Sequence, residues 1–89
     1  MTGKPRSPLE LLQALAVRQS EIAVAALEEA HSLDAENSSI ALHLAEVYQQ
    51  VGRVADARVL LTRGLEGARG RGEADTIQRF EDALNKLTR

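Results

Sequence analysis

The segment ALHLAEVYQQVGRVADARVLLTRG, residues 41–64, contains the spacing pattern that decides the fold. Apolar residues recur three or four positions apart on both sides of Gly52, as on the buried face of an α-helix. Gly52 suits a tight turn, because glycine adopts left-handed backbone angles without steric cost. Small side chains at Ala45 and Ala57 allow two helices to approach closely, and the Tyr48 ring fills the space between them. The segment therefore predicts an antiparallel helical hairpin.

The composition of the chain restricts its size class and its chemistry. Its 89 residues make one small domain, with too little sequence for two independent cores. Cysteine is absent, which excludes disulfides, cysteine-containing zinc sites and thiol catalysis. A net charge of −2 and only two aromatic residues argue against nucleic acid as a partner. No long apolar run predicts a membrane span and residues 1–8 do not resemble a signal peptide, so we expect a cytoplasmic protein.

Start and stop signals predict further helices on both sides of this hairpin. Ser7-Pro8-Leu9-Glu10 is a helix start with a capping box, and Ser20-Glu21 offers a second N-cap. Gly64 and Gly67 each cost about 1 kcal/mol relative to alanine, so the helix that contains them is expected to fray. We predict a flexible arm over residues 1–7 and one domain over 8–89. Its five helices are predicted at about residues 8–18, 20–33, 38–51, 54–68 and 73–88.

A weak internal repeat leads to a family resemblance. A shift of 34 residues aligns three identities at core-facing positions: Val17 with Val51, Ala23 with Ala57, and Leu27 with Leu61. The spacing of the central segment resembles the tetratricopeptide repeat signature: Ala41-x-x-Leu44-Ala45-x-x-Tyr48-x-x-x-Gly52, then Ala57-x-x-x-Leu61-x-x-Gly64. The resemblance covers about residues 8–88. It implies an all-α fragment of a right-handed solenoid, with two antiparallel helical hairpins and a C-terminal capping helix.

One face of the helix predicted over 38–51 is not needed for the core. Its members share helical spacing: Leu42, His43, Glu46, Gln49 and Gln50. With an offset of 36 residues, the last helix adds Gln78, Arg79, Asp82 and Lys86 to the same surface. In the resembling family such a face lines a concave groove, which implies a non-catalytic scaffold or adaptor that binds a peptide or protein segment. A merely solvated face is the alternative.

The first predicted helix departs from the family pattern. Glu10 and Ala14 stand where a large apolar residue and an aromatic are usual, and Arg18 stands where glycine is common. The helix also carries more apolar residues than one inner face needs, among them Leu9, Leu12 and Leu15. We predict that these leucines pack on a second protein or on a second copy of the chain as a homodimer. Alternatively, the helix folds over its neighbours and hides them internally.

No pattern points to catalysis or to a cofactor. The glycines after Leu61 do not follow a strand, so they do not form a phosphate-binding loop. His43 and Glu46 share a helix face but supply only two ligands, too few for a metal site, and His31 is expected on an exposed helix surface. Serine, histidine and aspartate occur without the strand-turn-helix context of a hydrolase. We therefore expect no enzyme activity, no cofactor and no metal.

Overall fold

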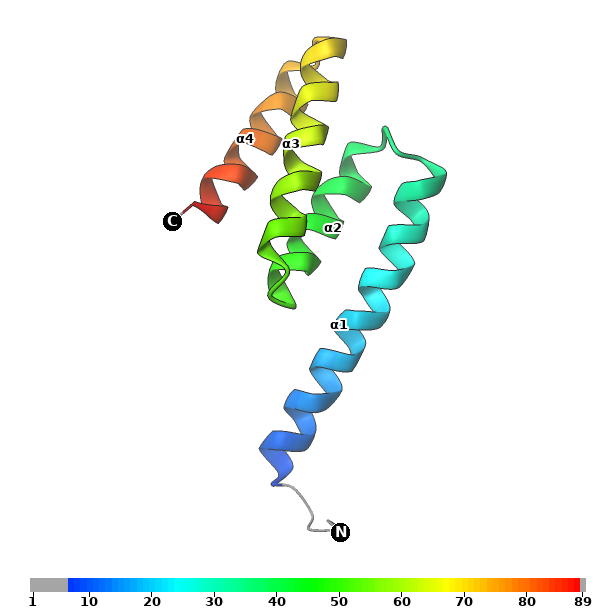
Figure 1. Ribbon diagram of the computed structural model, residues 1–89, viewed down its shortest axis with the longest axis vertical. Coiled ribbons are helices and arrows are strands. Elements are labelled where there is room, and N and C mark those ends of the chain that lie inside the picture. The colour runs from blue at the N-terminus through cyan, green and yellow to red at the C-terminus, as the bar shows by residue number, and fades with distance from the viewer. Residues whose placement is uncertain (1–6, 89) are drawn as a thin grey trace.

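The computed structural model describes residues 7–88, which form four α-helices. These are α1 (Pro8–Leu33), α2 (Ser38–Gln50), α3 (Val54–Arg71) and α4 (Ala74–Leu87). Successive helices run antiparallel, and short turns join them (Figure 1). Helix α2 contacts α1, α3 and α4, and α3 contacts both α2 and α4. The prediction of an all-α fold is confirmed, whereas the predicted arm lies outside the described residues except for Ser7.

Helix α1 corrects the prediction of two separate helices at 8–18 and 20–33. It is one continuous helix of 26 residues, so no hairpin forms within this part of the chain. Glycine and proline are absent between Leu9 and Val51, and Arg18 stands where the family commonly has glycine. Adding one residue to an existing helix costs far less than starting a new one, so the capping signal at Ser20 is overridden. The capping box at the other end does form, with the Glu10 amide donating to Ser7 Oγ at 3.2 Å.

The remaining helix ends lie close to their predicted positions, with one exception. Gly52 and Gly72 follow α2 and α3 with φ of +84° and +69°, the left-handed region that favours glycine. Helix α3 continues to Arg71, so the end predicted at residue 68 is wrong. Arg69 and Arg71 in its last turn favour this extension, because basic side chains interact well with the negative end of the helix dipole.

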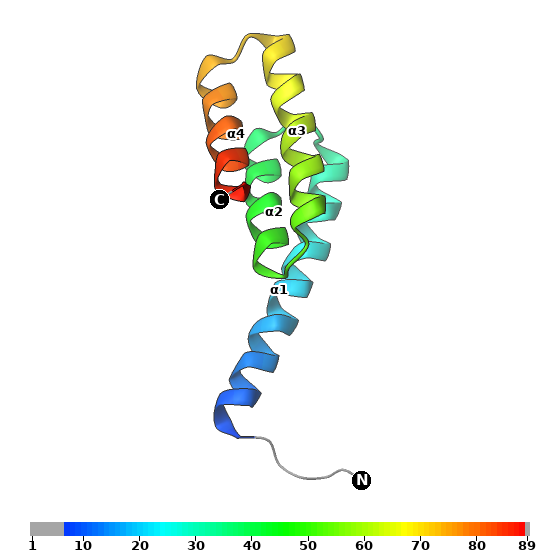
Figure 2. The ribbon, with the colours of Figure 1, turned by 60° about the vertical axis from the view of Figure 1, so that its left-hand side comes forward.

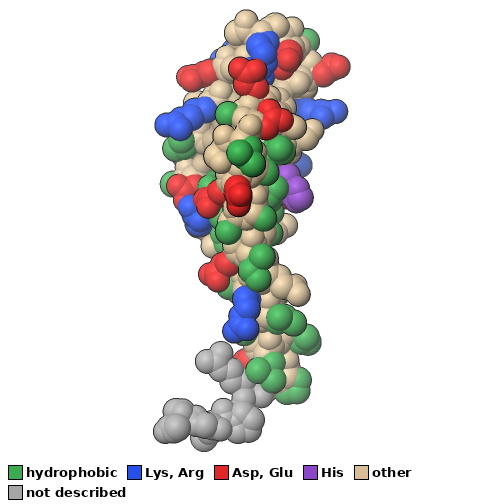
Figure 3. Space-filling view, turned by 90° about the vertical axis from the view of Figure 1, so that its right-hand side faces the viewer, with side chains coloured by type: hydrophobic (Ala, Val, Ile, Leu, Met, Phe, Trp, Pro, Cys, Tyr) green, Lys and Arg blue, Asp and Glu red, His purple; other side chains and the backbone are tan. Residues whose placement is uncertain are grey.

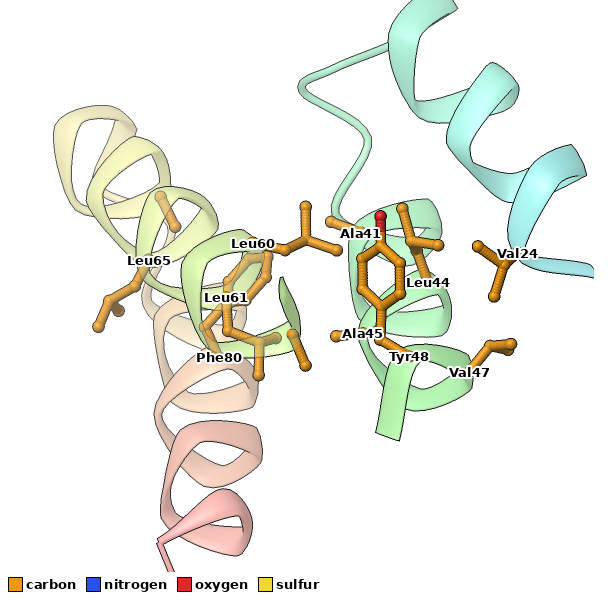
Figure 4. Close-up of a cluster of buried hydrophobic side chains, with 12 residues drawn as sticks. Val24, Ala41, Leu44, Ala45, Val47, Tyr48, Leu60, Leu61, Leu65 and Phe80 are labelled. Atoms are coloured by element: carbon orange, nitrogen blue, oxygen red, sulfur yellow. The ribbon is translucent and has the colours of Figure 1, made fainter. Parts of the chain in front are cut away.

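The core is formed mainly among α2, α3 and α4, and the second half of α1 adds Val24 to it (Figure 4). Its buried residues are Val24, Ala41, Leu44, Ala45, Val47, Tyr48, Ala57, Leu60, Leu61, Leu65, Ala68 and Phe80. Ala45 and Ala57, the two small residues of the predicted helix contact, are only 2% and 0% exposed. The close approach predicted for α2 and α3 is therefore present.

Helices α3 and α4 meet at Gly64, which faces the ring of Phe80. A methyl group added at Gly64 would lie 2.4 Å from two ring atoms, and Phe80 itself is 1% exposed. Such a distance is far below van der Waals contact, so only glycine fits without movement of the ring. Gly64 lowers the helix propensity of α3, but its missing side chain permits α3 to pack against α4.

A polar cluster fastens α1 to the turn between α2 and α3. The Tyr48 hydroxyl donates to Glu28 Oε2 at 2.6 Å, and the Arg53 guanidinium lies 4.5 Å from the centre of the Tyr48 ring. Arg53 also pairs with Glu28 at 3.6 Å and with Asp56 at 2.8 Å. Burial, and then the hydrogen bond to Glu28, raise the pKa of Tyr48 to about 12. Tyr48 therefore joins α1 to α2, in addition to its predicted place in the hairpin.

The first half of α1 extends beyond the other three helices (Figures 1 and 2). Residues 8–19 are all exposed, and the first α1 residue that packs against the core is Ala23. The described chain measures 57 × 31 × 17 Å as a consequence. The internal alternative, in which this segment folds back over its neighbours, is wrong.

Candidate functional site

The predicted binding face lies in a groove between α2 and α4. Both helices run antiparallel to α3, so they run in the same direction and contact each other (Figure 1). The groove has a volume of about 500 Å³. Ala45, Leu61, Leu42 and Ala83 supply its apolar floor, with Ala45 and Leu61 buried and the other two half-buried. Small residues on both helices keep this floor low, so polar side chains stand on either side of a hollow.

The structure brings most of the predicted residues together at this groove. It is lined by Leu42, His43, Glu46 and Gln49 of α2 and by Arg79, Asp82 and Lys86 of α4. Gln78 stands beside the groove, where its amide donates to Asp82 Oδ1 at 2.9 Å. Gln50 lies elsewhere, in a hollow that α2 forms with Val17, Ser20 and Glu21 of α1.

Sequence reasoning missed four residues of the groove: Ser39, Ala45, Leu61 and Ala83. Helical spacing could have found Ser39, because it lies three positions before Leu42 on the same face of α2. Leu61 carries no such signal, since it reaches the groove only through the packing of α3 behind α2 and α4. The sequence pattern places Ala45 only in the contact between α2 and α3, yet its small side chain serves both the core and the groove floor.

The charges along the groove are unevenly distributed. Arg79 and Lys86 stand on the α4 side, where Asp82 is held by Gln78, and Glu46 stands on the α2 side. Within residues 7–88, Arg79, Lys86 and Glu46 form no ion pair. The α4 side therefore offers two cations and the Asp82 carboxylate between them, and the α2 side offers a second carboxylate.

The two histidines occupy different environments. His43 is exposed at the groove, beside Glu46. His31 is half-buried, and its Nδ1 is buried without a hydrogen-bond partner among the described residues, so the expectation of an exposed side chain is wrong. Across residues 7–88 no three histidine, aspartate or glutamate side chains gather as metal ligands would. The side chains of the groove offer non-covalent contacts: apolar burial, amide hydrogen bonds and charge pairing.

The leucines predicted for self-association lie far from this groove. Leu9, Leu12 and Leu15 are 64%, 65% and 48% exposed on the projecting half of α1. The apolar surplus that the sequence indicates in this segment is thus present on the molecular surface.

Comparison with known families agrees with this architecture. The family model of the tetratricopeptide repeat matches residues 14–79, which is most of the chain, so the chain belongs to the tetratricopeptide repeat family. Proteins of this family typically act as non-catalytic modules of protein–protein interaction. No curated protein and no solved structure matches the chain significantly. No helix within residues 7–88 combines the length and the apolar character needed to cross a membrane.

Proposed function

We propose that the chain is a non-catalytic module that binds a segment of another protein in the groove between α2 and α4. The observation that carries this proposal is the meeting of Glu46, Arg79 and Lys86 around one apolar floor that includes Leu42. Both walls are helices held by the core, so little conformational freedom is lost when a ligand binds. The side chains that line the groove can therefore act as preformed contacts.

The charges of the groove suggest which segments fit it. Arg79 and Lys86 favour an acidic group on the α4 side, because a carboxylate there would pair with cations that are otherwise free within residues 7–88. An apolar side chain of the same segment would cover Leu42 and the alanines of the floor. We therefore expect a peptide that combines an apolar anchor with at least one aspartate or glutamate.

Selection from a library of displayed random peptides tests this function, because it requires no identified partner. We expect enriched peptides to combine an apolar residue with an acidic one. Their affinity, measured by fluorescence anisotropy, should fall about tenfold in Leu42→Ala and in the double variant Arg79→Ala/Lys86→Ala. Arg58→Ala is the matched control, because Arg58 is an exposed arginine of α3 outside the groove. Enriched peptides that bind the groove variants and the wild type equally well would contradict the proposal.

A second candidate function is self-association through the first half of α1. It is favoured by the exposure of Leu9, Leu12 and Leu15 together, since monomeric proteins rarely expose several neighbouring large apolar side chains. Each leucine or isoleucine that becomes buried contributes about 1.5–3 kcal/mol, while association itself costs about 4–15 kcal/mol. A weak dimer is therefore expected. Sedimentation velocity from micromolar to hundreds of micromolar concentration tests it, and a monomer throughout would exclude it.

A further inference from the structure

Helices α1 and α3 occupy equivalent places in the repeat, but they are not covered equally by neighbouring helices. Helix α3 is packed on one flank by α2 and on the other by α4. Residues 20–33 of α1 correspond to residues 54–67 of α3 under the 34-residue shift, yet α2 is the one helix that α1 contacts within the described chain. One flank of α1 therefore lacks the helix that covers the equivalent part of α3.

An apolar stripe runs along this uncovered flank of α1. Its members follow the alternating spacing of three and four residues that is typical of paired helices, with Glu29 at one position of the series. The other positions are Leu12, Leu15, Gln19, Ile22, Ala26 and Leu33. All are exposed, with Ile22 and Leu33 at 63% and 80%. The space-filling view from the α1 side shows hydrophobic side chains gathered along this helix (Figure 3). The stripe continues past the core into the projecting half of α1, so both halves present the same surface.

Only one surface of the described chain matches this stripe in composition. The exposed large apolar residues on residues 7–88 belong mainly to α1: Leu9, Leu11, Leu12, Leu15, Val17, Ile22 and Leu33. The others are Val54 and Val59 of α3, and neither α2 nor α4 contributes any. Stacking of α4 from one copy on α1 of the next would thus place a polar surface on an apolar one. The matching occupant is α1 of a second copy.

We propose that two copies pair through antiparallel α1 helices around a two-fold axis near Gln19 and Ile22. This inference rests on the self-association candidate and specifies its geometry. In this arrangement, residues 8–18 of each copy lie on residues 20–33 of the other. The sequence predicts that residues 8–18 form a hairpin with residues 20–33 of the same chain. In the proposed dimer they pack instead on residues 20–33 of the other copy, so the two chains exchange this segment.

The charges of α1 agree with such pairing. With 3.6 residues per turn, Glu10, Glu21 and Glu28 fall on the side of the helix away from the stripe. Glu28 accepts the hydrogen bond from Tyr48, which confirms that this side of α1 faces α2. Of the glutamates in α1 only Glu29 falls in the stripe. Its two copies would be offset by 17 positions, or about 25 Å along the helices, so acidic repulsion between the copies is small. Antiparallel pairing also sets the two helix dipoles in opposite directions, which is favourable.

Crosslinking of single cysteines tests the orientation, because the natural chain has no cysteine that would interfere. Around an axis between Gln19 and Ile22, the two copies of residue 22 lie close together. The two copies of residue 12 are offset by 17 positions, or about 25 Å along the helices. We therefore expect a short bismaleimide to link two copies of Ile22→Cys efficiently and two copies of Leu12→Cys hardly at all. Equal linking of both variants would indicate parallel helices and overturn the proposal.

Alanine variants test the surface itself. Leu15 and Ile22 are exposed in the single chain, so their replacement should leave the fold intact, and each change counts twice in a symmetric dimer. We expect Leu15→Ala/Ile22→Ala to raise the dimer Kd by about 100-fold or more in sedimentation equilibrium. Val59→Ala is the matched control, since Val59 is 51% exposed but lies on α3. If Val59→Ala dissociated the dimer and Leu15→Ala/Ile22→Ala did not, the proposed geometry would be overturned but self-association would stand. If the wild type were monomeric, both the geometry and self-association would be excluded.

Discussion

Substitution of Gly64 by alanine tests whether the approach of α3 to α4 depends on the missing side chain. The new methyl group would lie 2.4 Å from two atoms of the buried Phe80 ring, so the ring or the helix must move. Overpacking of this kind costs about 1–3 kcal/mol, while alanine gains about 1 kcal/mol over glycine in helix propensity. We expect the free energy of unfolding to fall by up to about 2 kcal/mol relative to the wild type, and by about 1–3 kcal/mol relative to a glycine-to-alanine change in α3 that meets no neighbour. Tm should fall by up to about 15 °C.

Urea denaturation followed by circular dichroism at the helical band measures this difference directly. Gly70→Ala is the control in the same helix, because a methyl group there meets nothing within 4 Å. It should leave stability unchanged or raise it by up to about 1 kcal/mol. A second control places Gly64→Ala in a Phe80→Leu background, where the smaller side chain should reduce its cost. If Gly64→Ala proved as stable as Gly70→Ala, the packing argument for this glycine would be refuted.

Three further changes have expected outcomes at other sites. The fold favours the protonated hydroxyl of Tyr48, whose pKa is about 12 against an ordinary 10, so stability is complete below pH 10 and falls by about 2–3 kcal/mol as pH rises to 12. Tyr48→Phe should flatten this decline in alkaline denaturation curves, and an unchanged slope would contradict the assignment. Gly52→Ala should lower stability by about 1–2 kcal/mol in urea denaturation because φ is +84°, although no atom blocks the methyl group. Ser7→Ala should speed amide hydrogen exchange at the start of α1 without a measurable change in Tm, because that segment lies outside the core; a clear drop in Tm would show that the segment supports it.

The hairpin of α2 and α3 could be predicted because its contacts lie within one continuous segment. Ala45, Tyr48, Gly52 and Ala57 follow one another at spacings that helical geometry converts directly into contacts. The groove face of α2 could be predicted for the same reason. The α4 side of the groove could be predicted once the sequences of α2 and α4 were aligned with the correct offset. Phe80 sets this offset, because it is the apolar residue of α4 that corresponds to Leu44 of α2.

The features that sequence reasoning missed depend on contacts between distant segments. The N-cap signal at Ser20 starts a new helix only where the tertiary structure favours a turn before it. Within residues 7–88 no element covers the outer flank of α1 to require such a turn. Gly64 reads as a weak point of α3 until Phe80, which lies 16 positions later, is placed beside it. Gln50 shares the helical spacing of the groove residues, but the last turn of α2 approaches α1 instead.

The division of α1 into a core half and a projecting half implies two levels of resistance to proteases. Arg18 is the only lysine or arginine in α1, and it lies in the segment where every residue is exposed. Local opening of such a segment requires little free energy, whereas cleavage within α2 or α3 requires opening of the whole core. Among the sites within helices, trypsin should therefore cut an unpaired chain first at Arg18, and the remaining fragment, which retains every buried residue, should persist as a folded product.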